Sequence, residues 1–261
     1  MTDDRERLRR TFDAAADRYH RARPRYPAEL LDRVCGVAAL RPGDRVLEVG
    51  CATGIATEPL AERGLDVTAV ELGPALAAEA RRRLARFPAV DVVEADFDRW
   101  SPGDDRFDAA VAATSWHWLD PATRCDRTAD ALRDGGHLAI WGATHVLPVG
   151  GDPFFDEIQA VYDEIGEPGA PTPRPGELPT IVDEIEGSER FAVVHVEQFD
   201  WETAYDADGY VELLETFSGH IAMAPWQRER LFGEIRRRLA ERPDGLLRRH
   251  WGGVLHVAGR R

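Results

Sequence analysis

The feature that most constrains this fold is an alternation of short β-branched runs with helical segments over residues 45–143. The β-branched runs predict five strands, at 45–50, 66–71, 90–96, 107–115 and 137–143. Between them, apolar residues at helical spacing predict helices at 55–63, 74–86 and 121–133. Alternation of this kind is typical of a doubly wound, mostly parallel α/β sheet with helices on both faces and right-handed crossovers.

The second half of the chain departs from this rhythm. Strands are predicted at 191–201 and within the C-terminal RRHWGGVLHVAG, and they bring the sheet to seven strands. Helices are predicted between these strands, at 207–218 and 225–241. An amphipathic stretch, PFFDEIQAVYDEIG, and the proline-rich EPGAPTPRPGELP precede them, so we expect an inserted helical cap with a movable flap at 166–179.

Charge and composition narrow the class of protein. The formal net charge of -14 argues against a nucleic acid partner and favours a small-molecule one. The N-terminus is charged and no apolar run is long enough to span a membrane, so a cytoplasmic protein without membrane contacts is expected. The three cysteines form no CxxC pair, and we expect reduced thiols and no metal site.

A loop of small residues follows the first strand, in LEVGCATG. Glycines at 50 and 54, with Cys51 and Ala52 between them, let a backbone approach a ligand and let the next helix pack closely on the sheet. The loop lacks the GxGxxG spacing of nicotinamide-binding proteins and the lysine of nucleoside triphosphatases. With Glu48 before it, the loop instead resembles the acidic residue and GxGxG of class I S-adenosylmethionine-dependent methyltransferases, with Ala52 replacing the middle glycine.

Polar residues end the following strands, where ligands of open α/β sheets bind. Glu71 ends the second strand, roughly 20 residues beyond the glycines, where a carboxylate can accept both hydroxyl hydrogens of a ribose. The resemblance places Leu72 beside the cofactor with Glu71. It also implies that Asp96 contacts the adenine amino group and that Phe97 covers the adenine ring. Thr114 and Ser115 end the fourth strand, beside the expected methionine half of the cofactor.

Two flanking motifs are similar to those of a narrower subgroup. Phe12, Ala16 and Tyr19, followed by RPRYP from Arg23, resemble the leader of trans-aconitate methyltransferase and its type 11 relatives. The HWxD run from His117 recurs in that subgroup. The resemblance implies that an N-terminal segment folds over the cofactor, with Tyr19 and Arg23 near its methionine end.

These observations divide the chain into four expected regions. A helical segment at 1–39 covers the cofactor, and a Rossmann-like core at 40–145 binds it. An inserted helical and loop cap occupies 146–190, and residues 191–261 complete the sheet with further cap helices. The expected activity is methyl transfer from S-adenosylmethionine to a small molecule, with S-adenosylhomocysteine as product, in a monomer or homodimer. The alternative is a protein of this fold that binds the cofactor without transferring methyl, such as a cyclase or a regulatory binder.

His117 is the candidate catalytic residue, and three roles are open to it. Methyl transfer is an in-line displacement that gains most of its rate from orientation, and a base is needed only when the acceptor has a proton to lose. His117 can accept that proton, contact the acceptor to position it, or only pack; acceptors at oxygen are favoured over carbon and nitrogen. His145 and His20 are weaker candidates, and Trp116 is a possible cover for the sulfonium.

The acceptor pocket is expected to belong to the inserted segments, because the sheet edge serves the cofactor. Aromatic and other large side chains of these segments are the candidates to line it: Phe154, Phe155, Tyr162, Phe217, His220, Met223 and Trp226. The acidic run at 183–186 is expected to form a solvated face, because it lacks the histidine partners of a metal site.

Overall fold

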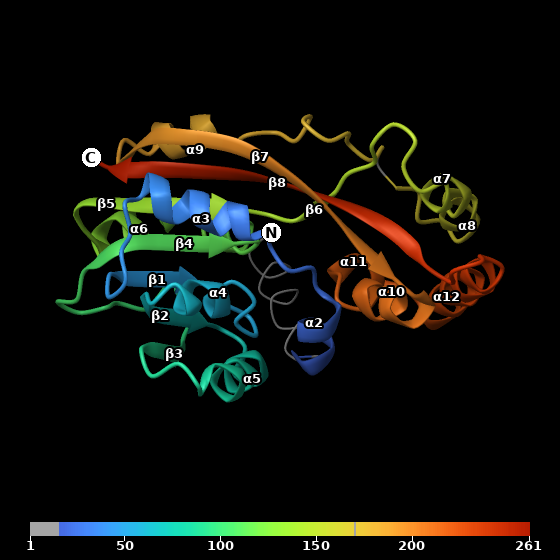
Figure 1. Ribbon diagram of the computed structural model, residues 1–261, viewed down its shortest axis with the longest axis horizontal. Helices are drawn as coiled ribbons and strands as arrows, with labels where there is room; N and C mark the ends of the chain where they lie inside the picture. Colours follow the sequence, from blue (N-terminus) through green and yellow to red (C-terminus); the bar gives the residue numbers. More distant parts are fainter. Residues whose placement is uncertain (1–15, 170) are drawn as a thin grey trace.

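The computed structural model describes residues 16–169 and 171–261, so Phe12 of the leader lies outside the described residues. Its centre is a twisted sheet in the order β3-β2-β1-β4-β5-β8-β7, with a two-residue strand β6 also paired to β8 (Figure 1). The strands are β1 (Arg45–Val49), β2 (Asp66–Glu71), β3 (Val90–Glu94), β4 (Phe107–Ala113), β5 (Leu132–Trp141), β6 (Thr144–His145), β7 (Phe191–Tyr205) and β8 (Leu247–Arg260). Strands β1 to β5 pair in parallel and β8 is antiparallel to both neighbours. The predicted mostly parallel, seven-stranded α/β fold is confirmed.

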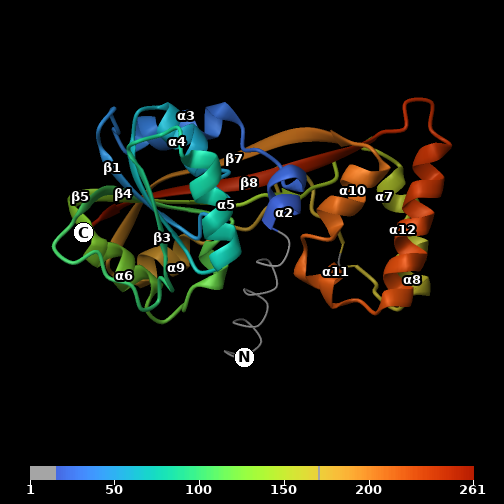
Figure 2. The same ribbon diagram turned by 90° about the horizontal axis from the view of Figure 1, so that it is seen from below.

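Helices cover both faces of this sheet, as Figure 2 shows. One face packs on α3 (Ala28–Val37), α4 (Thr57–Glu62) and α5 (Pro74–Leu84). The other face packs on α6 (Arg124–Ala131) and α9 (Val182–Gly187). The central strands are buried on both faces, which explains their nearly continuous apolar sequences. Among the described residues, no helix is long and apolar enough to cross a membrane.

Two predicted helices end earlier than their sequences indicate. The helix predicted to run to 133 stops at Ala131, because Leu132 turns to extended backbone and its buried side chain starts β5. The helix predicted at 207–218 is two helices, α10 (Ala207–Leu214) and α11 (Ser218–Ala222). The side chain of Asp206 caps α10 by accepting a hydrogen bond from the Gly209 amide at 2.7 Å.

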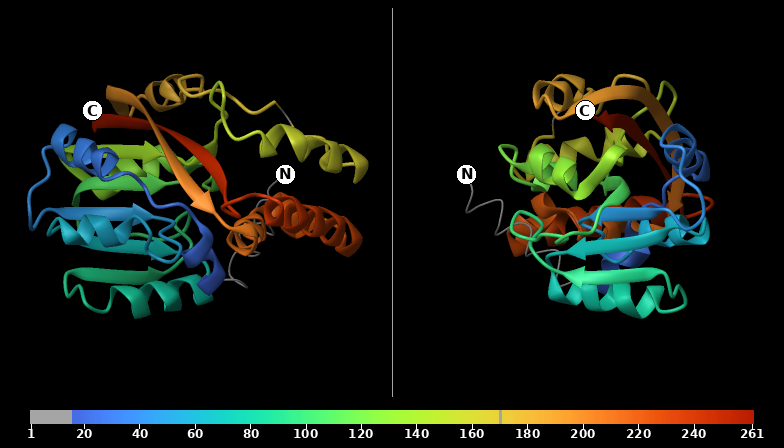
Figure 3. Two further views of the ribbon diagram at one scale, coloured as in Figure 1. Left: turned by 45° about the vertical axis from the view of Figure 1, so that its right-hand side comes forward. Right: turned by 90° about the vertical axis from the view of Figure 1, so that its left-hand side faces the viewer.

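Strands β7 and β8 extend beyond the sheet as a long ribbon that carries a helical cap (Figures 1 and 3). Helices α10, α11 and α12 (Pro225–Ala240) connect the two strands at that end. They share a buried core with α7 (Phe154–Glu157) and α8 (Gln159–Glu164). The segment 146–190 is therefore divided, since α7 and α8 join the cap whereas α9 packs on the sheet.

Helix α2 (Ala16–Ala22) lies between the sheet domain and the cap, against α5 and α10. Ala22 packs into the cap core, and Tyr26, just after the helix, packs against the core of the sheet. The N-terminal segment therefore crosses the opening between the carboxyl ends of the strands and the cap.

Candidate active site

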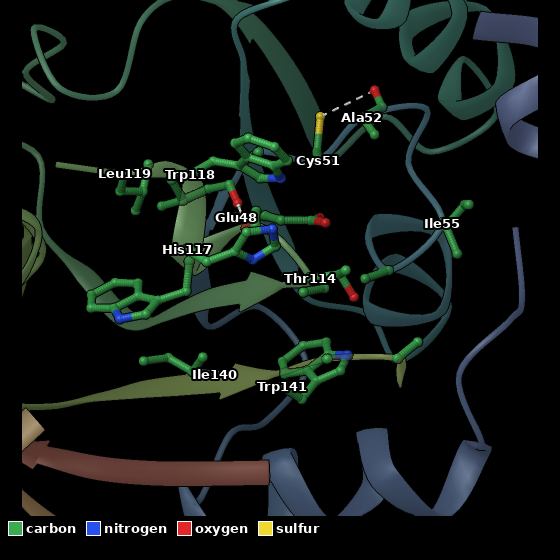
Figure 4. Close-up of a pocket in the computed structure, with 18 of the residues that line it drawn as sticks. Glu48, Cys51, Ala52, Ile55, Thr114, His117, Trp118, Leu119, Ile140 and Trp141 are labelled. Atoms are coloured by element: carbon green, nitrogen blue, oxygen red, sulfur yellow. Dashed lines mark hydrogen bonds between the residues drawn. The ribbon is translucent and has the colours of Figure 1, made fainter. Parts of the chain in front are cut away.

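A cavity of about 540 Å³ lies at the carboxyl ends of β1, β2 and β4, beneath α2. Figure 4 shows His117 and Glu48 pointing into it. Most of the predicted site residues line this cavity: Tyr19, Arg23, Glu48, Gly50, Cys51, Ala52, Glu71, Leu72, Phe97, Thr114, Ser115 and His117. Gly54 and Asp96 are not among its lining residues.

The glycine loop needs its small residues for close packing. Gly50 has φ +72°, and a Cβ there would lie 2.7 Å from the Cβ of Ser115. Gly54 has φ +87°, and its Cβ would lie 2.8 Å from Leu84 of α5, so this glycine serves helix packing. Ala52, which replaces the middle glycine, keeps the left-handed conformation at φ 49°. A non-glycine residue held there is a strained position of the kind found at functional sites.

Glu71 ties the glycine loop to the end of β2. Its Oε2 accepts a hydrogen bond from the Ala52 amide at 2.8 Å, and its Oε1 accepts one from the Gly73 amide at 2.8 Å. The residue is 7% exposed and lines the cavity. Each carboxylate oxygen can accept more than one hydrogen bond, so the side chain can hold the loop and also receive ligand hydroxyls.

Glu48 is a buried carboxylate on the floor of the cavity. It is 1% exposed, and among the described residues its Oε2 has no hydrogen-bond partner. Burial raises the pKa of Glu48 to about 7, and the nearby charge of Glu71 adds to the increase. A buried acceptor without a partner fits a ligand that brings a positive charge or a hydrogen-bond donor.

The N-terminal segment is fastened over the cavity by three polar contacts. The Tyr26 hydroxyl lies 2.8 Å from the hydroxyl of Thr114, which has φ +57°. Arg23 donates from Nε to the Thr216 hydroxyl at 2.9 Å and from Nη2 to its carbonyl at 2.6 Å. His20 Nδ1 lies 3.0 Å from the Thr53 hydroxyl. These contacts connect the segment to the loop, to β4 and to the cap.

Comparisons with known proteins agree with this geometry. Residues 46–136 match a family model described as a methyltransferase domain. The chain is 29% identical over 243 residues to an uncharacterized methyltransferase of Mycobacterium tuberculosis, covering 93% of this chain and 91% of the relative. A solved structure from Anaeromyxobacter dehalogenans, proposed to be a type II methyltransferase, has a TM-score of 0.63 at 24% identity, over 91% of this chain and 97% of that one. A methyltransferase of Geobacter sulfurreducens, solved with S-adenosylhomocysteine, has a TM-score of 0.51 at 18% identity, over 92% and 93% of the two chains.

These similarities support a class I S-adenosylmethionine-dependent methyltransferase whose matched domain spans residues 46–136. Enzymes of this class use S-adenosylmethionine and release S-adenosylhomocysteine. Two features of the methyltransferase fit that cofactor. Gly50 leaves room where a Cβ would collide with Ser115, and Glu48 Oε2, which has no hydrogen-bond partner among the described residues, suits a cationic group.

His117 lies in a short 3-10 helix, Trp116–Trp118, that follows β4. Its imidazole faces the open cavity of the methyltransferase (Figure 4). Burial among the cavity walls lowers the pKa of His117, and the positive charges of Arg124 and Arg23 lower it further. The ring is therefore neutral near pH 7, the state in which it can accept a proton.

The other two candidate bases do not line the cavity. His145 packs on Phe155 with ring centroids 4.3 Å apart, and burial lowers its pKa to about 3. Burial also lowers the pKa of His20 to about 4, while its ring joins Thr53 and Arg25. Within the described part of the chain, no group of three or more His, Cys, Asp or Glu could hold a metal ion.

Asp96 lies at the turn after β3, outside the cavity lining. Its Oδ1 accepts a hydrogen bond from the Asp98 amide at 3.2 Å, and its Oδ2 is 3.8 Å from Arg99. Phe97 is buried and does line the cavity. The contact of Asp96 with adenine therefore stays a prediction, whereas Phe97 lies where a ring could be covered.

Most of the large side chains expected to line an acceptor pocket lie outside the cavity. Of the seven large residues expected there, only Phe217 lines the cavity, and Trp226 is 59% exposed. The others pack within the cap core or on its edge: Phe154, Phe155, Tyr162, His220 and Met223. The cavity wall is built instead from small and aliphatic residues that the sequence did not single out: Ile140, Leu178, Pro179, Ile181 and Val254.

Proposed function

We propose that this methyltransferase transfers a methyl group to a small-molecule acceptor by in-line displacement, at oxygen in preference to carbon or nitrogen. The observation that carries the proposal is a single cavity that runs from the glycine loop, past His117, to an apolar compartment. In Figure 4, Cys51 and Ala52 lie on one side of His117, and Leu119 and Ile140 lie on the other. Cofactor and acceptor can therefore meet at His117.

We assign the cofactor half of the cavity to the residues nearest the glycine loop. Glu71 would receive the ribose hydroxyls, and Glu48 would face the positive charge of the methionine half. The backbone of the glycine loop, side chains of the strand ends and the N-terminal segment would enclose the remaining atoms: Tyr19, Arg23, Gly50, Cys51, Ala52, Leu72, Phe97, Thr114 and Ser115. Gly54 supports this loop through its contact with α5, and Asp96 stays a candidate for adenine.

When bound, S-adenosylmethionine supplies a methyl carbon activated by a positively charged sulfur. The task of the chain is then to hold the acceptor in line with that carbon and to exclude water, an orientation effect worth roughly 7 kcal/mol or more in favourable cases. The segment through Tyr26 and the turn at Trp116–Trp118 close two sides of the cavity. The neutral His117 can take the proton of a hydroxyl or phenol as the new bond forms.

The finer assignments of the protein are part of the same proposal. We propose membership of the subgroup similar to trans-aconitate methyltransferase, supported by the position of Tyr19 and Arg23 on the cavity wall. We further propose a cytoplasmic monomer or homodimer with no nucleic acid or membrane partner, supported by the net charge of -14.

The test is incubation of the protein with methyl-labelled S-adenosylmethionine and a panel of phenols, alcohols, amines and carboxylic acids. We expect S-adenosylhomocysteine and a labelled product in equal amounts with at least one hydroxyl acceptor. The Gly50→Ala variant is the control, because its added Cβ should obstruct the cofactor site at the glycine loop. Cofactor binding without transfer to any acceptor class would favour the binding-protein alternative.

A further inference from the structure

The part of the cavity beyond His117 is an apolar compartment with one wall from the insertion. Leu178, Pro179 and Ile181, from the chain just before α9, form that wall. Ile140 of β5 and Val254 of β8 also line the cavity. Leu178 also packs into a small buried cluster with Val146 and Val254, so the wall is part of the folded core.

Hydrogen bonds hold this wall against the sheet. The Ile181 amide donates to Nε2 of His256 on β8 at 3.1 Å. Gln198 of β7 donates from Nε2 to the carbonyls of Gly176 at 3.1 Å and Leu178 at 3.3 Å. Both ends of the wall are thus attached to the sheet domain, which gives the compartment a defined width.

The charges around the cavity disfavour an anionic acceptor. Among the described lining residues, the charged side chains are Glu48, Glu71 and Arg23. Arg23 already donates two hydrogen bonds to Thr216. An anionic acceptor would add a third negative charge beside two carboxylates and a single guanidinium, two of whose N–H groups already bind Thr216, and burying it there is costly.

We propose that the acceptor is a neutral, mostly apolar molecule whose body fills the compartment lined by residues 178–181, Ile140 and Val254, with its reacting hydroxyl toward His117. This inference rests on the proposed function and adds to it the class of acceptor and the wall that selects it. The compartment offers dispersion contacts and apolar burial to a ring or short hydrocarbon body. The imidazoles of His117 and His256 also line the cavity.

The test uses protein saturated with S-adenosylhomocysteine and two probes of the same shape, 4-phenylphenol and 4-phenylbenzoic acid. At about pH 7.5 the phenol is neutral and the acid is ionised. Calorimetric titration should show that the phenol binds at least about tenfold more tightly than the acid. Equal or tighter binding of the acid, or no binding of either probe, would overturn the inference.

Variants of the wall provide a second test, of whether this wall binds the phenol. Ile181→Asp should weaken phenol binding by about tenfold or more, since it puts a charge into the apolar wall, and Ile181→Ala by a smaller factor. Affinity for S-adenosylhomocysteine should stay within about twofold in both variants, because Ile181 lies beyond His117 from the glycine loop. Val149→Asp is the matched control at a position that is 86% exposed and outside the cavity lining.

Unchanged phenol affinity in both Ile181 variants would also overturn the inference. If Ile181→Asp does not fold, Ile181→Ala and Leu178→Ala decide the result, since both only remove apolar contact. If the wild-type protein binds S-adenosylhomocysteine but does not bind the phenol more tightly than the acid, only this inference is contradicted. Failure to bind S-adenosylhomocysteine contradicts the proposed function as well.

Discussion

Glu184 of the insertion holds the indole of Trp116, next to His117. Its Oε1 accepts a hydrogen bond from Trp116 Nε1 at 2.8 Å, and its Oε2 lies 2.6 Å from the guanidinium of Arg124. Arg124, which is 8% exposed, also donates to the Trp116 carbonyl at 2.8 Å. Glu184 is exposed, as expected for the acidic run at 183–186, yet its carboxylate makes both of these contacts. The turn that carries His117 is positioned from α6 and α9 together.

Replacing Glu184 should therefore lower the rate of methyl transfer more than the affinity for the cofactor. Glu184→Ala leaves the buried Arg124 without its carboxylate, and we expect a loss of about 1–3 kcal/mol in the free energy of unfolding. We expect kcat to fall about tenfold or more while the affinity for S-adenosylhomocysteine stays within about twofold. Glu184→Gln, which keeps an oxygen for Trp116, should recover part of kcat. The exposed Asp183→Asn is the control, and equal effects of the two sites would contradict a positioning role.

His117→Gln separates the three roles open to the imidazole. If the ring takes the acceptor proton, turnover of a hydroxyl acceptor should fall about 100-fold, because the glutamine amide cannot accept that proton. Because the pKa of His117 is lowered from 6.5, the acid limb of the wild-type rate profile should lie below pH 6.5 and disappear in the variant. Near-full activity of His117→Gln would leave only positioning or packing.

Glu48 gives the cofactor-free protein a distinctive pH dependence. Its pKa is raised from 4.5 to about 7, so the folded state binds a proton that the unfolded state releases. The stability contributed by the protonated form is present below pH 4.5 and is lost as the pH rises to about 7, by an amount on the order of 3 kcal/mol. Glu48→Gln should lack this loss. Urea unfolding of the wild-type and Glu48→Gln proteins at about pH 5 and pH 8 measures this loss of unfolding free energy. The same loss in both proteins would contradict a raised pKa of Glu48.

Two glycine substitutions test whether Gly50, unlike an ordinary glycine of the fold, is needed for cofactor binding. Gly50→Ala puts a Cβ 2.7 Å from Ser115 in a left-handed conformation, so we expect lost cofactor binding and about 1–3 kcal/mol of destabilisation. Gly36→Ala, in α3 with nothing within 4 Å of the new Cβ, should keep full binding and stabilise the fold by about 0.5–1 kcal/mol. Thermal unfolding with and without S-adenosylhomocysteine compares the two. If S-adenosylhomocysteine raises the unfolding temperature of both variants equally, Gly50 is not needed for cofactor binding.

The cavity lining near the glycine loop was predictable from the sequence because its residues follow strand ends. Parallel strands bring their carboxyl ends to one edge, so locating β1, β2 and β4 also places Glu48, Glu71 and Thr114. Gly54 shows the limit of this reasoning. The same motif position serves helix packing against Leu84, and a sequence pattern does not distinguish the two uses.

The rest of the cavity lining was not predictable in the same way, because contacts there join distant parts of the chain. Arg23 and Thr216 are 193 residues apart, and Trp116 and Glu184 are 68 residues apart. Large aromatic residues such as Phe154 and Tyr162 looked suited to a pocket, yet they build the cap core. The wall of small and aliphatic residues around Leu178 carries no motif, and only the folded chain brings it to the cavity.

The most direct test of the central claim is calorimetric titration of S-adenosylhomocysteine into the wild-type, Glu71→Ala and Glu94→Ala proteins. Glu94 is the matched control, because it ends β3 opposite Glu71 but does not line the cavity. We expect one ligand per wild-type chain, unchanged affinity in Glu94→Ala, and at least about tenfold weaker binding in Glu71→Ala. No heat of binding in the wild-type protein, or equal affinity in all three, would contradict a cofactor site at this sheet edge.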